Sequence, residues 1–149
     1  MANTYQNILL AVDFHDDNDA VIEKATKMAE LHSAKLHLVH VHEPIRMVSG
    51  ADGIQIVEGF ETVEAGFRSK SEESLNELAA KLEVAERDRH LLEGRPAAEI
   101  HEFCAANDID LVVIGSHGKH GLQLLLGSTA SSILHNASCD VLAVRIKGE

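Results

Sequence analysis

Short apolar runs alternate with longer amphipathic stretches along the chain, and this alternation predicts five strands separated by helices. A strand is expected at residues 7–12, which are apolar after Asn7, and another at the unbroken apolar run 111–114; such runs are typical of parallel strands buried on both faces. The other strands are expected at 35–42, 85–92 and 141–146. Residues 85–92 carry the most polar side chains, which favours an edge position for that strand.

Helical spacing of apolar residues fills the intervals between these strands. Helices are expected up to about residue 31, over 59–83, over 96–107, and from 127 onward. Residues 43–58 lack a regular pattern but are too apolar for a disordered linker, so we interpret them as a covering loop. The helix over 59–83 is expected to face the sheet with six apolar residues and to expose its charges: Phe60, Val63, Phe67, Leu75, Leu78 and Leu82. Because each crossover is long enough for a right-handed unit, the fold class is α/β with a parallel sheet.

A glycine-rich segment follows the strand at 111–114. Gly115, Gly118 and Gly121 recur at every third position, and Gly127 precedes Ser128-Thr129 at a predicted helix start. Glycines let backbone N–H groups approach a phosphate closely, and a helix N-terminus favours negative charge. A phosphate-binding loop is therefore one hypothesis, and a tight strand–helix turn without a ligand is the other.

Two nucleotide-binding fingerprints are absent from this segment. The P-loop requires Gly-Lys followed by Ser or Thr, whereas Gly118-Lys119 is followed by His120. The dinucleotide pattern Gly-x-Gly-x-x-Gly is also missing, since the spacing here is Gly-x-x-Gly-x-x-Gly. The sequence supports neither a P-loop NTPase nor a nicotinamide enzyme.

Composition narrows the class of protein. At 149 residues, of which 45% are hydrophobic, residues 1–149 are expected to form a single domain. No apolar run approaches the length of a membrane span, and the N-terminus lacks signal-peptide features, so a cytoplasmic location is expected. With 24 acidic against 13 basic residues and a net charge of −11, nucleic-acid binding is not expected.

Metal and disulfide chemistry have little support in the sequence. Cys104 and Cys139 lie far apart along the chain without metal-ligand spacing, so both are expected to be reduced and packed. His40 and His42 share one face of a predicted strand, where a His-x-His metal pair is conceivable. Because no third ligand is identifiable, we interpret them as polar residues at the ligand-facing end of the strand and predict no metal site.

Two residues at strand ends are candidates for contacting a nucleotide. Asp13 follows the first strand at its carboxyl end, where open α/β sheets bind ligands, and its carboxylate can accept hydrogen bonds from a ribose. The alternative is that Asp13 caps the following helix. Val41, on the face opposite His40 and His42, can supply an apolar wall for a base.

The last strand, residues 141–146, is too apolar to form a bare sheet edge without inviting pairing. We therefore predict a homodimer through that edge or its neighbouring surface.

Several of these segments together resemble the universal stress protein family over the whole chain. They are residues 7–13 (NILLAVD), 38–41 (LVHV), 109–118 (IDLVVIGSHG), 127–128 (GS) and 141–144 (VLAV). The resemblance implies a five-stranded, doubly wound, Rossmann-like sheet of the adenine nucleotide alpha hydrolase type, with strand order 3-2-1-4-5. It also implies homodimerisation through the last strand, a cytoplasmic role in stress endurance and, in one branch of the family, ATP binding.

The resemblance also implies a set of nucleotide-binding residues. The adenine and ribose positions match Asp13 and Val41 with Ile114 and Gly115 nearby, and the phosphate positions match the glycine loop. The full set is Ala11, Asp13, Val41, Ile114, Gly115, His117, Gly118, Gly127, Ser128 and Thr129. ATP-binding members usually have nine residues between the second glycine and the final Gly-Ser, whereas residues 119–126 number eight, as in the branch that does not hold ATP. That branch commonly loses the glycines, which this chain retains.

Three functions remain open at this point. The first is a non-catalytic stress-response dimer that binds ATP or another adenine nucleotide as a regulatory ligand, with or without magnesium. The second is a slow ATP hydrolase or nucleotidyl transferase in which His117 or His120 handles a proton. The third is a nucleotide-free module for protein interaction, with a partner that the sequence does not identify. The first is preferred, since no convincing nucleophile–base pair is visible.

Overall fold

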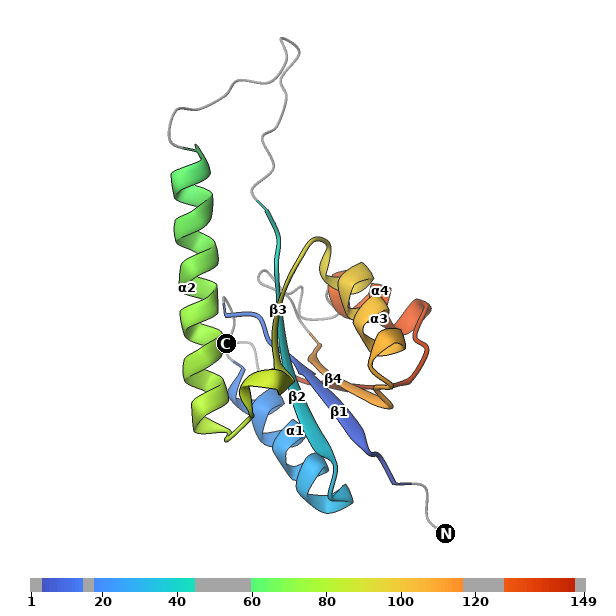
Figure 1. Ribbon diagram of the computed structural model, residues 1–149. Coiled ribbons are helices and arrows are strands. Elements are labelled where there is room, and N and C mark those ends of the chain that lie inside the picture. Colours follow the sequence, from blue (N-terminus) through green and yellow to red (C-terminus); the bar gives the residue numbers. More distant parts are fainter. Residues whose placement is uncertain (1–3, 15–17, 45–59, 117–127, 147–149) are drawn as a thin grey trace.

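The computed structural model describes residues 4–14, 18–44, 60–116 and 128–146, without the side chains of residues 60, 61, 128 and 129. Figure 1 shows a central sheet with helices on both sides. The long helix α2 runs along one side of the sheet.

All described strands run parallel. They are β1 (Asn7–Ala11), β2 (Lys35–His42), β3 (Arg89–Glu93), β4 (Leu111–Gly115) and β5 (Asp140–Val144). The sheet order is β3-β2-β1-β4-β5, with every neighbouring pair parallel. The predicted doubly wound sheet with order 3-2-1-4-5 is thus confirmed, and the third strand does lie at an edge.

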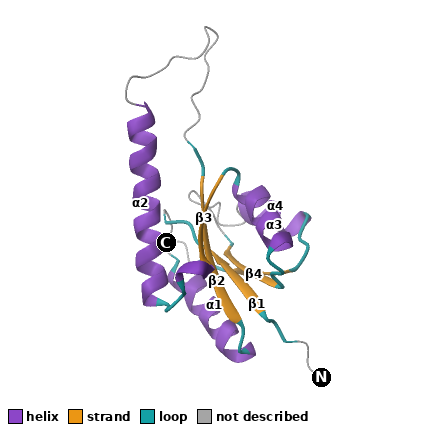
Figure 2. Ribbon diagram, in the orientation of Figure 1, coloured by secondary structure: helices purple, strands orange, loops and turns teal. Residues whose placement is uncertain are grey.

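The α-helices of the described residues cover both faces of this sheet (Figure 2). They are α1 (Asp19–His32), α2 (Phe60–Lys81), α3 (Pro96–Ala106) and α4 (Ser128–His135). One apolar core joins α1 and α2 to the sheet, and a second joins α3 and α4 to its other face. Their largest fully buried side chains include Leu10 and Leu38 in the first core and Leu9 and Ile133 in the second.

The third strand differs from the prediction in its first half. Residues Glu86–Asp88 form a 3-10 turn, and the strand itself begins only at Arg89. The backbone N–H of Asp88 donates to the carbonyl of Ala85, and the Asp88 side chain turns inward, where it is buried. The polar run therefore folds as a turn that carries a buried carboxylate to the sheet.

The expected apolar face of α2 is right for its second half and wrong for its first. Leu75 is buried, whereas Val63 and Phe67 are 51% and 52% exposed. Figure 1 shows the first half of α2 rising beyond the strands, so that it has little sheet to cover. The buried residue there is Glu64, a charge that the prediction had assigned to the solvated face.

No helix in the part of the chain that the structure describes combines the length and the apolar character needed to cross a bilayer.

Candidate functional site

The alternation of side chains along β2 divides the candidate residues between the two faces of the sheet. Val39 and Val41 pack into the core under α3 and α4, and Leu38 packs into the core under α1 and α2. His40 and His42 follow Leu38 with the strand period of two, so they share its face. The predicted separation of Val41 from the two histidines is therefore present in the fold.

Three of the predicted nucleotide-binding residues lie together. Ala11, Val41 and Ile114 come from the carboxyl ends of β1, β2 and β4, which are neighbours in the sheet. All three belong to the core under α3 and α4; Val41 and Ile114 are buried, and Ala11 is half-buried. These three residues, which we call the apolar floor, thus lie near the carboxyl ends of the strands, at the edge of the sheet where open α/β folds receive ligands.

Asp13 lies two residues beyond the end of β1 and is half-buried. The Asn18 side-chain amide donates to the Asp13 carbonyl at 2.6 Å, which ties the start of α1 to the end of β1. The N-cap residue of α1 is Asn18. Asp13 is therefore not the capping residue that the alternative interpretation required.

Gly115 has a packing reason to be glycine. A Cβ atom at this position would lie 2.5 Å from Cδ1 of Ile146 and 3.5 Å from Cγ2 of Val21. Both neighbours belong to the core under α1 and α2. The absence of a side chain at Gly115 thus lets Ile146 pack against the sheet, whether or not a ligand contacts the backbone.

Only some of the remaining predicted phosphate-binding residues belong to the described part of the chain. His117, Gly118 and Gly127 lie outside the described residues, as does His120. Ser128 and Thr129 open α4, and the next residue, Ala130, is buried in the core. The predicted helix start at the end of the glycine segment is thus present, and its phosphate-binding role stays a prediction.

His40 and His42 make specific contacts under the α1 and α2 layer. Nδ1 of His40 lies 2.8 Å from the Val12 carbonyl oxygen, and its ring packs against Phe14 with centroids 4.8 Å apart. Nε2 of His42 lies 2.6 Å from Oε1 of Glu64 in a buried hydrogen bond. The two histidines therefore point into the protein on the face opposite the predicted adenine floor.

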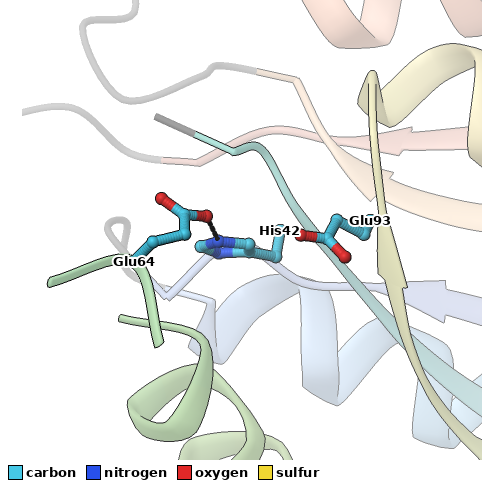
Figure 3. Close-up of side chains that lie close together, drawn as sticks. All are labelled: His42, Glu64 and Glu93. Carbon is cyan, nitrogen blue, oxygen red and sulfur yellow. Dashed lines mark hydrogen bonds and ion pairs between the residues drawn. The ribbon is translucent and has the colours of Figure 1, made fainter. Parts of the chain in front are cut away.

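The fold adds a second carboxylate to His42. The parallel register pairs His42 of β2 with Glu93 of β3, so both side chains leave the sheet on the same face. One ligand atom each from His42, Glu64 and Glu93 lies within 4.8 Å of the other two. Figure 3 shows this group, which we call the carboxyl-end triad.

A second group of histidines lies at the other end of β2. His37 stacks near His90 with centroids 6.3 Å apart, and the His90 ring lies 4.5 Å from that of Phe103. Nε2 of His37 contacts Oδ1 of Asn7 at 3.2 Å, and its Nδ1 is 3.8 Å from Asp88. Burial lowers the pKa of both imidazoles, and the Asp88 carboxylate partly opposes this. We call His37, His90, Asp88 and Phe103 the amino-end cluster.

The two cysteines are not isolated in space, contrary to what their sequence separation suggested. Cys104 is buried in the core under α3 and α4, and Cys139 packs against that core. Burial raises the pKa of the Cys104 thiol to about 12, with a further contribution from its hydrogen bond to Cys139. Both thiols are free, and Cys104 is packed as expected.

Sequence reasoning missed the carboxyl-end triad and the amino-end cluster. His42 was noted, but Glu64 and Glu93 belong to segments whose charges are typical of solvent-facing positions. The available signal was the polar interruption of an otherwise apolar strand at 35–42, which requires buried partners for each histidine. The partners themselves depend on register and helix placement.

Comparison with known proteins agrees with the fold. The model of the universal stress protein family matches residues 4–145. Universal stress protein A homolog 2 of Coxiella burnetii is 37% identical over 148 residues, which cover 98% of this chain and 99% of that protein. The chain therefore belongs to the universal stress protein family.

Solved structures share the architecture. UspA from Lactobacillus plantarum superposes with a TM-score of 0.75 at 22% identity, covering 97% of this chain and 100% of the other. A universal stress protein in complex with cAMP superposes with a TM-score of 0.58 at 22% identity, covering 96% and 98%.

Proposed function

We propose that the protein is a cytoplasmic stress-response dimer that binds an adenine nucleotide, ATP first among the candidates, as a regulatory ligand. The observation that carries the proposal is the convergence of Ala11, Val41 and Ile114 at the carboxyl ends of three adjacent strands. This floor offers an apolar surface for a base. Asp13, two residues beyond the end of β1, offers a carboxylate that can accept hydrogen bonds from a ribose.

The proposed binding of the ligand's phosphates is supported by the sequence and by one feature of the fold. The glycine segment begins after β4 and ends where α4 starts at Ser128, so strand, loop and helix follow in the order that anion sites use. A related fold holds cAMP in one solved member of the family.

The dimer part of the proposal rests on the position of β5. This strand lies at the end of the sheet order and pairs with β4, and it consists of Asp-Val-Leu-Ala-Val. An apolar edge strand of this kind is a template for pairing with a second copy. Sedimentation of the purified protein should give the mass of two chains. The Val141→Lys variant should give a mass closer to that of one chain.

The nucleotide is tested by release and by titration. Purified protein is denatured and its supernatant analysed for bound nucleotide, and ATP is then titrated calorimetrically with and without magnesium. We expect Asp13→Ala to weaken ATP binding at least about tenfold, as for a lost charge-assisted hydrogen bond of about 1.5–3 kcal/mol. Asp19→Ala, a matched change on the exposed start of α1, should leave affinity unchanged.

Two outcomes would count against the proposal. Absence of both bound nucleotide and any binding of added nucleotide would remove the ligand while leaving family membership intact. Measurable ATP turnover that is lost in His117→Ala or His120→Ala would favour a catalytic role instead.

A further inference from the structure

The carboxyl-end triad combines an imidazole with two carboxylates from three separate elements. His42 ends β2, Glu64 lies in the first half of α2, and Glu93 ends β3. His42 and Glu64 are 7% and 9% exposed, and burial of a glutamate is rare unless it is paired or binds an ion. Figure 3 shows Glu64 on one side of His42 and Glu93 on the other.

We propose that His42, Glu64 and Glu93 bind one divalent transition-metal ion, with Zn²⁺ as the test ion. Imidazole nitrogen and carboxylate oxygen are a donor set that suits zinc and its neighbours, whereas Mg²⁺ and Ca²⁺ prefer oxygen alone. Three protein ligands leave the remaining coordination position for water.

The distances fit a site that closes around an ion with small side-chain movements. Tetrahedral ligands about 2.0–2.2 Å from zinc lie roughly 3.3–3.6 Å from one another. The three ligand atoms already lie within 4.8 Å of each other, and Nε2 of His42 is 2.6 Å from Oε1 of Glu64. Binding thus requires the His42–Glu64 hydrogen bond to open by somewhat less than an ångström while Glu93 closes in.

The charges also match. Two carboxylates and a neutral imidazole carry two negative charges, which a divalent cation neutralises. Without an ion, Arg68 of α2 forms an ion pair with Glu93. Both side chains of that pair are 46% exposed, and exposed ion pairs contribute little to stability. A metal ion can therefore replace Arg68 as the partner of Glu93 at a low cost in free energy.

This site is separate from the proposed nucleotide floor. His42 belongs to the face of β2 under α1 and α2, whereas Val41 packs under α3 and α4. Metal binding is therefore expected in the absence of any nucleotide, and its outcome is independent of the ATP titration.

The experiment measures Zn²⁺ binding to the full chain after removal of metals with a chelator. Calorimetry in a nucleotide-free buffer should show one site per chain for the wild type. Glu64→Gln and Glu93→Gln should each weaken that site at least about tenfold, since losing even an outer partner of a metal ligand costs 10–100-fold. Glu77→Gln, a matched change at an exposed position of the same helix, should bind like the wild type.

Arg68→Met provides a test that leaves all three ligands in place. Removing the competing cation should strengthen Zn²⁺ binding by about two- to fivefold, the equivalent of an exposed ion pair. Circular dichroism of each variant verifies that the fold is retained. This gain of affinity keeps the proposal testable even if a ligand variant unfolds.

Cobalt identifies the ligand set. Co²⁺ bound at the triad should show visible d–d bands without the intense near-ultraviolet bands of thiolate coordination, because the triad contains no cysteine. Thiolate bands, Zn²⁺ binding unaffected by both glutamine substitutions, or the absence of binding would each overturn the proposal.

Discussion

Histidines are buried at both ends of β2, but the groups that surround them differ between the two ends. In the amino-end cluster, His37 has its nearest carboxylate at 3.8 Å, and its Nδ1 has no hydrogen-bond partner among the described residues. In the carboxyl-end triad, His42 is hydrogen-bonded to Glu64 at 2.6 Å with Glu93 close by. The first environment favours a neutral ring, and the second offers two carboxylates to a bound cation.

The difference shows that the partner elements, and not the residue type, decide what a buried histidine does. His37 faces Phe103 and the imidazole of His90, so burial dominates and lowers its pKa. His42 faces two carboxylates because α2 extends past the sheet and β3 ends beside it. One strand therefore carries a packed histidine at one end and a candidate ligand at the other.

The strongest way to disturb both groups is to weaken the strand between them. Leu38 is fully buried midway along β2, and Leu38→Ala should lower the free energy of unfolding by about 2–5 kcal/mol through lost burial and a cavity. Urea denaturation measures the change. Leu31→Ala, on a leucine that is 77% exposed, should stay within about 0.5 kcal/mol. Equal losses in the two variants would contradict the assigned packing.

A second prediction compares the coupling within the two groups. In chelator-treated protein, His42→Leu or Glu64→Leu alone leaves a buried polar partner and should cost about 1–3 kcal/mol. The double substitution should cost less than the sum, because each single substitution already removes the same His42–Glu64 hydrogen bond. Denaturant unfolding of the four proteins gives the coupling energy.

The corresponding cycle on His37 and Asp88 is the control. At 3.8 Å, beyond hydrogen-bond range, their coupling should be below about 0.5 kcal/mol. Equal coupling in both cycles would show that the two ends of β2 are alike.

The positions of the sheet strands could be predicted from the sequence because buried strands have a characteristic residue composition. Apolar runs such as 111–114 and β-branched residues predict buried parallel strands wherever they occur. The same reasoning failed at Val63 and Phe67, since helical spacing reports an apolar stripe but not how far the sheet extends beneath it. Helix length relative to strand length is a property of the whole fold.

The candidate site was predictable to the extent that it depends on single strands. Asp13 and Val41 were candidates because of their places near strand ends, whereas Ala11 and Ile114 were implied only by the family resemblance. The carboxyl ends of neighbouring parallel strands bring Ala11, Val41 and Ile114 to one edge of the sheet. The carboxyl-end triad depends instead on register: Glu93 meets His42 because β3 starts at Arg89, after a turn that the sequence had suggested was strand. A shift of one residue would send Glu93 to the other face.

The smallest expected effect concerns pH and sharpens the contrast at the amino end. Burial lowers the pKa of His37 and His90 below their ordinary value of 6.5. The unfolded chain therefore takes up protons as the pH falls through about 6.5, before the folded protein does, so stability declines from there until the pH passes the lowered pKa. The wild type should lose stability between pH 7.5 and pH 5, and His37→Gln should lose less over the same interval in urea titrations.

His135→Gln, on an exposed histidine of α4, should leave the slope of stability against pH as in the wild type. If His37→Gln also leaves the slope unchanged, burial is not what keeps this imidazole neutral, and the two ends of β2 differ less than their geometry implies.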